Sequence, residues 1–470
     1  MAATLGAFAA ALRWEALPAP VRTAGIRLLL DTVGVILAGA ATAPGRRVAA
    51  VSPRRWPEDE ATLLGVGSVC SLEGAAFGNA TLAKIVGMED SNRTCGHVAS
   101  QVVPAALAAG EARGASGAEV VVAVIAGYEV FARVGREVRK AHLVRGLDIK
   151  GTVGTIASAA AAARAWRLDG IRTAHALGLA ASLASGLETY AYDPEGDTEW
   201  LVAGFAARNG VFAARLAEAG FRAPRRALEG PGGFGQAFGE GFDAGRAVAA
   251  LGEYFEVERA GFKPHSGCRH VHQAVDAAVE IRQHLAAAGG GQIDPASIEA
   301  VTVATYRHAV AAPFRTTTTP LSAGAAGYSL PVATAIGLLF GSFYPEDIAR
   351  YQDPCVRALA RKVRLAVDPE IEARHPEWNG CEVRVRLRGG REVAARLTHA
   401  RGEPENPLSD QALAAKFRRL AGATLPSPQV EALLRRLWTL DAAENIRAVM
   451  PLTLPGPGPV STAGEDPQTG

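Results

Sequence analysis

The chain has 470 residues, 49 basic and 47 acidic, and its net charge of +2 at pH 7 argues against nucleic acid or an anionic membrane as a partner. Its composition, 49% hydrophobic and 20% charged, is ordinary for a globular protein, and its length allows more than one core. Five widely spaced cysteines without a CxxC pair, and a start that lacks the basic region of a signal peptide, predict free thiols and a cytoplasmic location.

Residues 1–262 are predicted to form the first part of an all-helical domain. Apolar side chains recur at helical spacing in six segments: 21–40, 104–115, 118–138, 154–168, 170–188 and 206–220. Two predicted helices consist almost entirely of Ala, Gly and small aliphatic residues. Helices that are apolar all round are buried on all sides, so we expect them inside the domain or against a second subunit.

The pattern changes after residue 262. Residues 297–310 alternate like a strand, 361–370 do so more weakly, and 381–400 form two alternating runs around Gly389 and Gly390, which is typical of a β-hairpin. Within the uncharged run 316–345, the apolar part 332–341 is too short to span a bilayer and predicts a buried helix behind a polar loop. We therefore expect an α+β lid domain over residues 263–402.

The end of the chain returns to helix over residues 403–453, with Ser409 as an N-cap, and the Pro/Gly/Ser-rich tail 454–470 is predicted to be disordered. The predicted fold class is thus mainly α with a smaller α+β domain. A large all-helical domain is interrupted by the inserted lid domain.

One polar loop, GMEDSNRTCGHVAS at residues 87–100, separates two helical segments. It is a metal clip, a catalytic loop or a solvated turn, and its composition leaves all three open. His97 lies just before an apolar helix, where a histidine has a lowered pKa and can transfer protons near neutral pH. A lone histidine of this kind is more often structural.

A second stretch, KPHSGCRHVH at residues 263–272, holds three of the ten histidines. Zinc ligands are conceivable, with Cys95 and His97 from the polar loop adding donors, but the spacing fits no familiar zinc pattern. The other interpretations are an exposed helix N-terminus and the edge of an active site, where Lys263 attracts an anion. We predict no metal and no cofactor.

A third stretch, GPGGFG at residues 230–235, matches the G-x-G-x-x-G pattern of dinucleotide-binding proteins. No strand is predicted before it, and the pattern needs one. It is interpreted as a tight loop between helices.

Seven segments in this order carry a family resemblance: LLLDTVGVILAGA, EDSNRTCGHVASQVVPAALAAGE, GTVGTIASAAAAARAWRLDG, GFAARNGVFAARLAEAGF, LEGPGGFGQAF, GFKPHSGCRHVHQAVDA and PLSDQALAAKF. Together they resemble the MmgE/PrpD family, which includes 2-methylcitrate dehydratase, cis-aconitate decarboxylase and iminodisuccinate epimerase. The resemblance covers residues 5 to 450. It implies a helical domain, a smaller α+β lid, a homodimer, and cofactor-independent chemistry on small polycarboxylates.

The resemblance can be carried over residue by residue. Matching positions are Asp90, His97, Lys263, Cys268, Arg269 and His272, and Ser91 stands where a threonine is common. Four positions depart: Gly87 replaces an acid, Asp148 a histidine, Glu199 a lysine and Val332 a tyrosine. Because a buried acid repels a substrate carboxylate, Asp148 and Glu199 predict a substrate less anionic than citrate or aconitate.

The sequence therefore predicts a divergent lyase or isomerase. The candidate catalytic residues are His97, Lys263, Asp148 and Glu199, and the candidate substrate-binding residues are Asp90, Ser91, Arg93, Arg269 and His272. Three alternatives remain open: an ordinary 2-methylcitrate dehydratase or cis-aconitate decarboxylase, a non-catalytic binding protein that kept the fold, and a zinc hydrolase.

Overall fold

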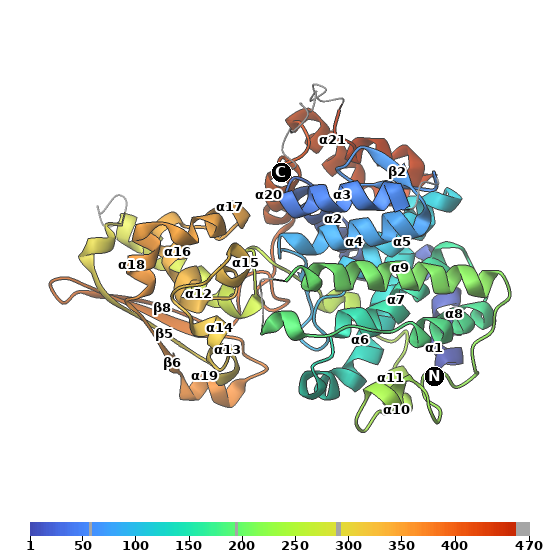
Figure 1. Ribbon diagram of the computed structural model, residues 1–470, viewed down its shortest axis with the longest axis horizontal. Helices are drawn as coiled ribbons and strands as arrows, with labels where there is room; N and C mark the ends of the chain where they lie inside the picture. The colour runs from blue at the N-terminus through green and yellow to red at the C-terminus, as the bar shows by residue number, and fades with distance from the viewer. Residues whose placement is uncertain (56–58, 193–195, 288–292, 457–470) are drawn as a thin grey trace, which may run out of the picture.

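The computed structural model describes residues 1–55, 59–192, 196–287 and 293–456. It has a large helical domain and a smaller α+β domain, which lie side by side (Figure 1). The fold class predicted from the sequence, mainly α with a smaller α+β domain, is confirmed. The predicted disordered tail falls mostly on residues 457–470, outside the described residues.

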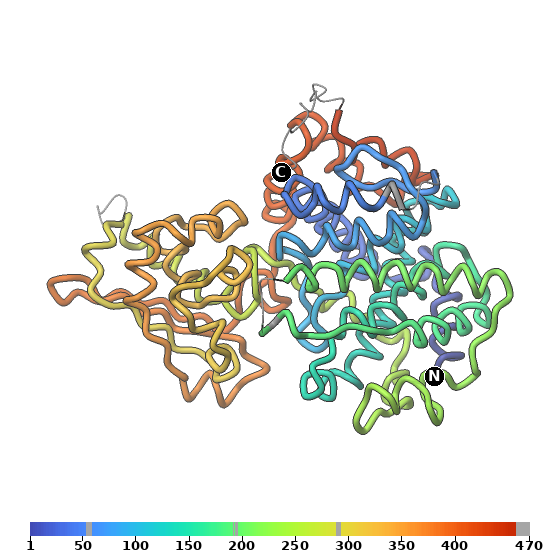
Figure 2. Tube along the Cα trace, in the orientation of Figure 1, coloured from blue at the N-terminus to red at the C-terminus, as the bar shows by residue number. Residues whose placement is uncertain are grey.

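The helical domain is built from both ends of the chain (Figure 2), and the C-terminal segment packs against N-terminal helices. Its helices are α1 Ala2–Ala11, α2 Ala19–Ala40, α3 Ala43–Arg55, α4 Leu72–Ile85, α5 Ala99–Arg113, α6 Gly117–Arg145, α7 Ile149–Ala165, α8 Gly170–Ser182, α9 Thr198–Glu218, α10 Phe234–Phe238, α11 Ala244–Val248, α20 Asp410–Ala421 and α21 Ser427–Trp438. The sequence did not predict the hairpin formed by β1 Ala61–Leu63 and β2 Ser68–Cys70.

Small side chains let α7 pass through the centre of this domain. It packs against α5, α6, α8 and α9, and every residue from Lys150 to Ala165 is buried. A Cβ at Gly210 of α9 would lie only 2.4 Å from the Cβ of Ser158, so the two helices approach at glycine. Burial of the Ala/Gly-rich helices is confirmed, and α7 is covered by neighbours within one chain.

One helix, α2, is long and apolar enough to cross a membrane, but 78% of its apolar window is buried inside the protein. The C-terminal α20 packs along it, and Lys416 forms a buried ion pair with Asp31 at 2.7 Å. Ser409 caps α20 through a hydrogen bond from the backbone nitrogen of Ala412, as predicted. This makes α2 a core helix, held by the returning segment.

The α+β domain contains a four-stranded sheet in the order β6-β5-β7-β8, formed by β5 Ile298–Thr305, β6 Val363–Val367, β7 Cys381–Leu387 and β8 Glu392–Leu397. Strands β5 and β6 are parallel, and the other pairs are antiparallel. The hairpin predicted at Gly389 and Gly390 is confirmed, with φ values of +95° and +86° that favour glycine. The strand predicted over residues 297–310 ends early, because the chain turns into helix at Arg307.

Helices cover this sheet, and the predicted buried helix is α16 Leu330–Phe340, which packs against α12 Arg269–Leu285. The remaining helices are short: α13 Arg307–Val310, α14 Pro313–Thr316, α15 Ala323–Ala326, α17 Pro345–Ile348, α18 Pro354–Ala360 and α19 Pro369–Arg374. The sheet and these helices enclose a second hydrophobic core, separate from that of the helical domain.

A short strand pair joins the two parts of the predicted site. Strand β3, Asp90–Ser91, pairs with β4, Gly261–Phe262, in antiparallel register. This pairing brings the polar loop at residues 87–97 beside Lys263, where the chain crosses from the helical to the α+β domain. The GPGGFG stretch lies elsewhere, in a turn that leads into α10, and no strand precedes it within residues 221–230.

Candidate active site

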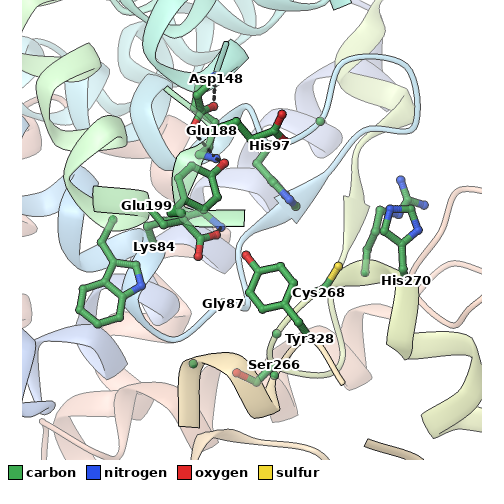
Figure 3. A pocket seen from close by; sticks show the side chains of 18 of the residues that line it. Lys84, Gly87, His97, Asp148, Glu188, Glu199, Ser266, Cys268, His270 and Tyr328 are labelled. Carbon is green, nitrogen blue, oxygen red and sulfur yellow. Dashed lines mark hydrogen bonds and ion pairs between the residues drawn. The ribbon is translucent and has the colours of Figure 1, made fainter. Parts of the chain in front are cut away.

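A cavity of about 420 Å³ lies between the two domains (Figure 3). The four candidate catalytic residues, His97, Asp148, Glu199 and Lys263, all line it, although they are scattered along the chain. The helical domain supplies the first three and the interdomain crossing supplies Lys263. Their convergence is a geometric finding, and their catalytic roles stay a prediction.

The orientation of His97 is fixed by a backbone carbonyl. Its Nδ1 lies 2.6 Å from the carbonyl oxygen of Asp90, which can only accept, so Nδ1 carries the proton. Nε2 makes no hydrogen bond with the described residues, and the imidazole lines the cavity. Burial and the positive charge of Lys263 hold the pKa of His97 well below its usual value, so the ring is neutral with a free lone pair.

The buried carboxylate of Glu89 organises two lysines next to His97. Glu89 accepts from Lys263 Nζ at 3.0 Å and also binds Lys84 Nζ. The carbonyl oxygens of Gly87 and Gly267 take the other two donors of Lys263, each at 3.1 Å. An ammonium has three donors, so Lys263 has none left for a substrate. The predicted role of Lys263 in attracting an anion stays a prediction, and in this structure it would act through its charge and not through a free N–H donor.

The negative charge of Glu199 is compensated by a lysine that the sequence analysis did not identify. Lys84 of α4 lies 3.1 Å from Glu199 Oε1. Burial alone would raise the pKa of Glu199, but Lys84 and Lys150 lower it, so the carboxylate is charged. The pKa of Lys84 is raised, because attraction to Glu199 and Glu89 outweighs the effect of burial. The family resemblance implies a lysine at position 199. This position still lies beside a lysine ammonium, because Lys84 of α4 supplies one.

Asp148 has a similar partner in Lys150. One carboxylate oxygen of Asp148 caps α7 by accepting from the backbone nitrogen of Lys150 at 2.8 Å, and the other lies 2.9 Å from Lys150 Nζ. Lys150 Nζ also donates to the Tyr190 hydroxyl at 2.8 Å. Asp148 is thus a helix cap in an ion pair.

These ion pairs change the charge expected for the cavity. Its lining includes six cationic side chains against three carboxylates: Lys84, Arg139, Lys150, Lys263, Arg269 and Arg315 face Asp148, Glu188 and Glu199. The sequence-based expectation of a cavity made negative by Asp148 and Glu199 is therefore corrected. Lys84 donates to Glu89 and forms an ion pair with Glu199, and Lys150 donates to Tyr190 and forms an ion pair with Asp148, so within the described residues each ammonium keeps at least one donor for a ligand.

The departures at Gly87 and Val332 also have physical explanations. Gly87 has φ +63°, and a Cβ there would lie 2.8 Å from the backbone nitrogen of Gly267, so this backbone favours glycine over an acid. Val332 is buried in α16 and does not line the cavity. Tyr328, four residues earlier, lines the cavity instead, beside Glu199. Burial raises the pKa of Tyr328 well above its usual value, so the hydroxyl keeps its proton.

Among the candidate substrate-binding residues, only Arg269 lines the large cavity, and it is paired with Glu403. Asp90 is buried and accepts from the backbone nitrogens of Val98 and Ala99, which start α5. Burial raises its pKa to about 7. Its contacts therefore give it a structural role.

The other three candidates also lie outside the large cavity. Arg93 donates to the carbonyl oxygen of Glu377 at 2.9 Å and pairs with Glu403 and Glu405. Ser91 and His272 line only a small second pocket. Ser91 is held in the β3 pairing and His272 lies in the first turn of α12, so neither lines the large cavity, and their role in substrate binding stays a prediction.

The zinc ligands considered from the sequence do not form a cluster in the described part of the chain. One group there brings three ligand atoms within 4.8 Å, namely His399, Glu403 and Glu405. Two arginines, Arg93 and Arg269, already pair with these carboxylates. The positive charge that a cation would supply at this group is therefore present already.

The fold and the cavity define a class: a two-domain protein whose interdomain cavity holds a neutral histidine among lysines. Residues 3–247 match the MmgE/PrpD N-terminal domain and residues 265–440 match the MmgE/PrpD C-terminal domain. The chain belongs to the MmgE/PrpD family.

Curated relatives are similar to this chain over nearly its whole length. A cis-aconitate decarboxylase of Aspergillus terreus is 25% identical over 467 residues, covering 95% of this chain and 94% of its own. The human cis-aconitate decarboxylase is 27% identical, covering 94% and 92%. The cis-aconitate decarboxylase-like protein oryM of Aspergillus oryzae is 24% identical, covering 93% of each chain. The family and these relatives support an enzyme of the lyase type.

Proposed function

We propose that this protein is a cofactor-independent lyase or isomerase that moves a proton on a small carboxylic acid with fewer carboxylates than aconitate. The observation that carries the proposal is the fixed tautomer of His97. Its Nδ1 is held by the Asp90 carbonyl, so Nε2 is available as a base toward the cavity. We also propose a homodimer in the cytoplasm, where the five free cysteines stay reduced.

The proton-transfer step follows from the groups around His97. Nε2 removes a proton from a carbon next to a carbonyl or carboxylate group, and negative charge develops on the oxygen of that group. The remaining donors of Lys84 and Lys150 stabilise this oxyanion. Tyr328, which keeps its proton and lines the cavity, can return a proton to carbon or to a leaving group. Loss of water or reprotonation then completes the reaction. In a decarboxylation the order is different: the carbon–carbon bond breaks first, carbon dioxide leaves, and the electron pair left on carbon takes a proton from a protonated donor such as Tyr328.

The lysine pairing supports a substrate with few carboxylates. Lys84, Lys150 and Lys263 each already bind a protein carboxylate, so their charges are largely compensated before a ligand arrives. A tricarboxylate would need additional cations to offset the cost of burying its charges. When Glu89 and Glu403, which pair with cations of the lining, are counted with its three acids, six cationic side chains face five carboxylates, and this small surplus suits one or two substrate carboxylates.

A second candidate is decarboxylation of cis-aconitate itself, which the full-length similarity to the curated decarboxylases favours. To distinguish the two candidate functions, the protein is dialysed against a chelator and incubated with mono-, di- and tricarboxylic acids that have an acidic C–H bond. Products are followed by NMR. Turnover confined to acids with one or two carboxylates supports the proposal, and efficient turnover of cis-aconitate or 2-methylcitrate favours the second candidate. No turnover of any acid by folded protein supports a non-catalytic binding protein.

A further inference from the structure

Two of the cavity's guanidinium groups form no ion pair with a carboxylate of the described residues. Arg139 of α6 makes no hydrogen bond or ion pair with the residues that the structure describes. Arg315 of α14 donates from Nη1 to the His308 carbonyl oxygen at 2.6 Å, and its Nε is buried without a partner. The third arginine of the cavity, Arg269, is paired with Glu403. Two arginines that have not been assigned a role therefore remain free to bind an anion.

Both arginines line the interdomain cavity. Arg315 is fixed to His308, whose ring contacts that of His270 with centroids 5.0 Å apart. Figure 3 shows His270 on the opposite side of the cavity from Lys84 and Glu199. Arg139 and Arg315 both lower the pKa values of His270 and His308, and burial is the largest cause for each, so the histidines add no charge there.

We propose that Arg139 and Arg315 form a carboxylate subsite that anchors the substrate between the two domains. Arg139 comes from the helical domain and Arg315 from the α+β domain, so one bound carboxylate would bridge both. The planar fork of each guanidinium suits the two oxygens of a carboxylate. That the bound carboxylate belongs to the substrate rests on the proposed function. That the two arginines bind an anion does not depend on it.

The absence of a side chain at residue 96 leaves the Arg139 guanidinium uncrowded on that side. Gly96 lies beside Arg139, and a Cβ added there would be 3.3 Å from Nη1, so a larger side chain would crowd the guanidinium. Arg315 packs over the ring of Phe314, with its guanidinium carbon 5.3 Å from the centroid. This cation–π contact and the hydrogen bond to His308 hold the Arg315 side chain.

One carboxylate, Glu188, opposes an anion at this subsite. Glu188 lines the cavity, and burial raises its pKa, while Lys150, Arg139 and Arg315 act in the opposite direction. It forms no hydrogen bond or ion pair through its side chain with the described residues. A bound carboxylate would be repelled by Glu188, so removing this charge should tighten binding.

The test is calorimetric titration of succinate into the full-length protein. Arg139→Gln and Arg315→Gln should each weaken binding by about ten-fold or more, since each removes a charge-assisted hydrogen bond. Arg315→Lys should recover part of the loss because it keeps the charge without the fork. Glu188→Gln should tighten binding. Arg361→Gln, an exposed arginine of the same domain outside the cavity, is the matched control and should bind as the wild type does.

The direction of each change in affinity distinguishes the possible outcomes. Unchanged succinate affinity in both arginine variants overturns the subsite, and so does weaker binding in Glu188→Gln when its thermal melting is normal. Inorganic phosphate is titrated in parallel. If phosphate binds more tightly than succinate and depends on both arginines, the ligand is a phosphoryl group and the carboxylate assignment is overturned. Arginine-dependent succinate binding without turnover of any acid would keep the subsite and contradict the proposed function.

Discussion

Replacing Glu199 with glutamine should raise the affinity of the cavity for tricarboxylates. Glu199 lies 3.1 Å from Lys84 Nζ. A ligand carboxylate that accepts from the remaining Lys84 donor would lie about 3 Å from Nζ. Because Nζ lies between the two carboxylates, the ligand charge would then be at most about 6 Å from the charge of Glu199. At an effective dielectric constant of about 20 the repulsion is about 3 kcal/mol, or about 100-fold in affinity, and solvent screening reduces the gain to between about 10- and 100-fold.

The assay is calorimetric titration with tricarballylate, the saturated analogue of aconitate, beside succinate. In Glu199→Gln the affinity for tricarballylate should rise more than that for succinate, because the variant frees a second Lys84 donor and leaves Glu89 to hold the lysine. The control is Glu431→Gln, which removes an exposed glutamate paired with Arg418. Unchanged or weaker tricarballylate binding, with normal circular dichroism and melting, would refute the reasoning that Glu199 sets the charge limit.

Because the pKa of His97 is held well below 6.5, the acid limb of the kcat/KM pH profile should lie well below pH 6.5, and a limb at 6.5 or above would contradict a neutral buried base. Glu199→Lys alone should cost about 3 kcal/mol in the free energy of unfolding by facing the buried Lys84, and adding Lys84→Glu should restore most of it; additive losses in chemical denaturation would oppose the pairing. The exposed apolar side chains Val144 and Tyr192, 77% and 78% exposed, fit a homodimer interface, and a monomeric mass by light scattering at micromolar concentration would contradict it.

The fold was largely predictable because its determinants are local. Helical spacing of apolar residues placed the helices, and Gly389-Gly390 placed the hairpin. Boundaries were less accurate: α7 begins at Ile149 because Asp148 caps it, five residues before the predicted segment. The fold class and family were predicted correctly from the order of seven motifs.

The candidate site was predictable only in part, because its charges are paired across the fold. The resemblance identified His97, Asp148, Glu199 and Lys263, and the structure brings them to one cavity. Lys84, whose charge compensates Glu199, lies on α4, and nothing in the sequence around it indicates that it pairs with a residue of α9.

The same reason explains the other omissions. Arg139 and Arg315 lie far apart in sequence on helices of different domains, so no spacing rule connects them. Asp148 and Lys150 are two residues apart, a spacing that does not pair side chains within a helix, and they pair because Asp148 is the cap. The sequence analysis identified the acids Asp148 and Glu199 but not the lysines that pair with them.

Proton transfer by His97 is the central claim, and deuterium exchange tests it most directly. Small carboxylic acids with one or two carboxylates are incubated with the protein in D₂O, and loss of a C–H signal is followed by NMR. The wild type should exchange one proton of its substrate, and His97→Gln should lose at least about 100-fold of that rate while still binding the acid. Exchange at an undiminished rate in His97→Gln, in correctly folded protein, would contradict the account.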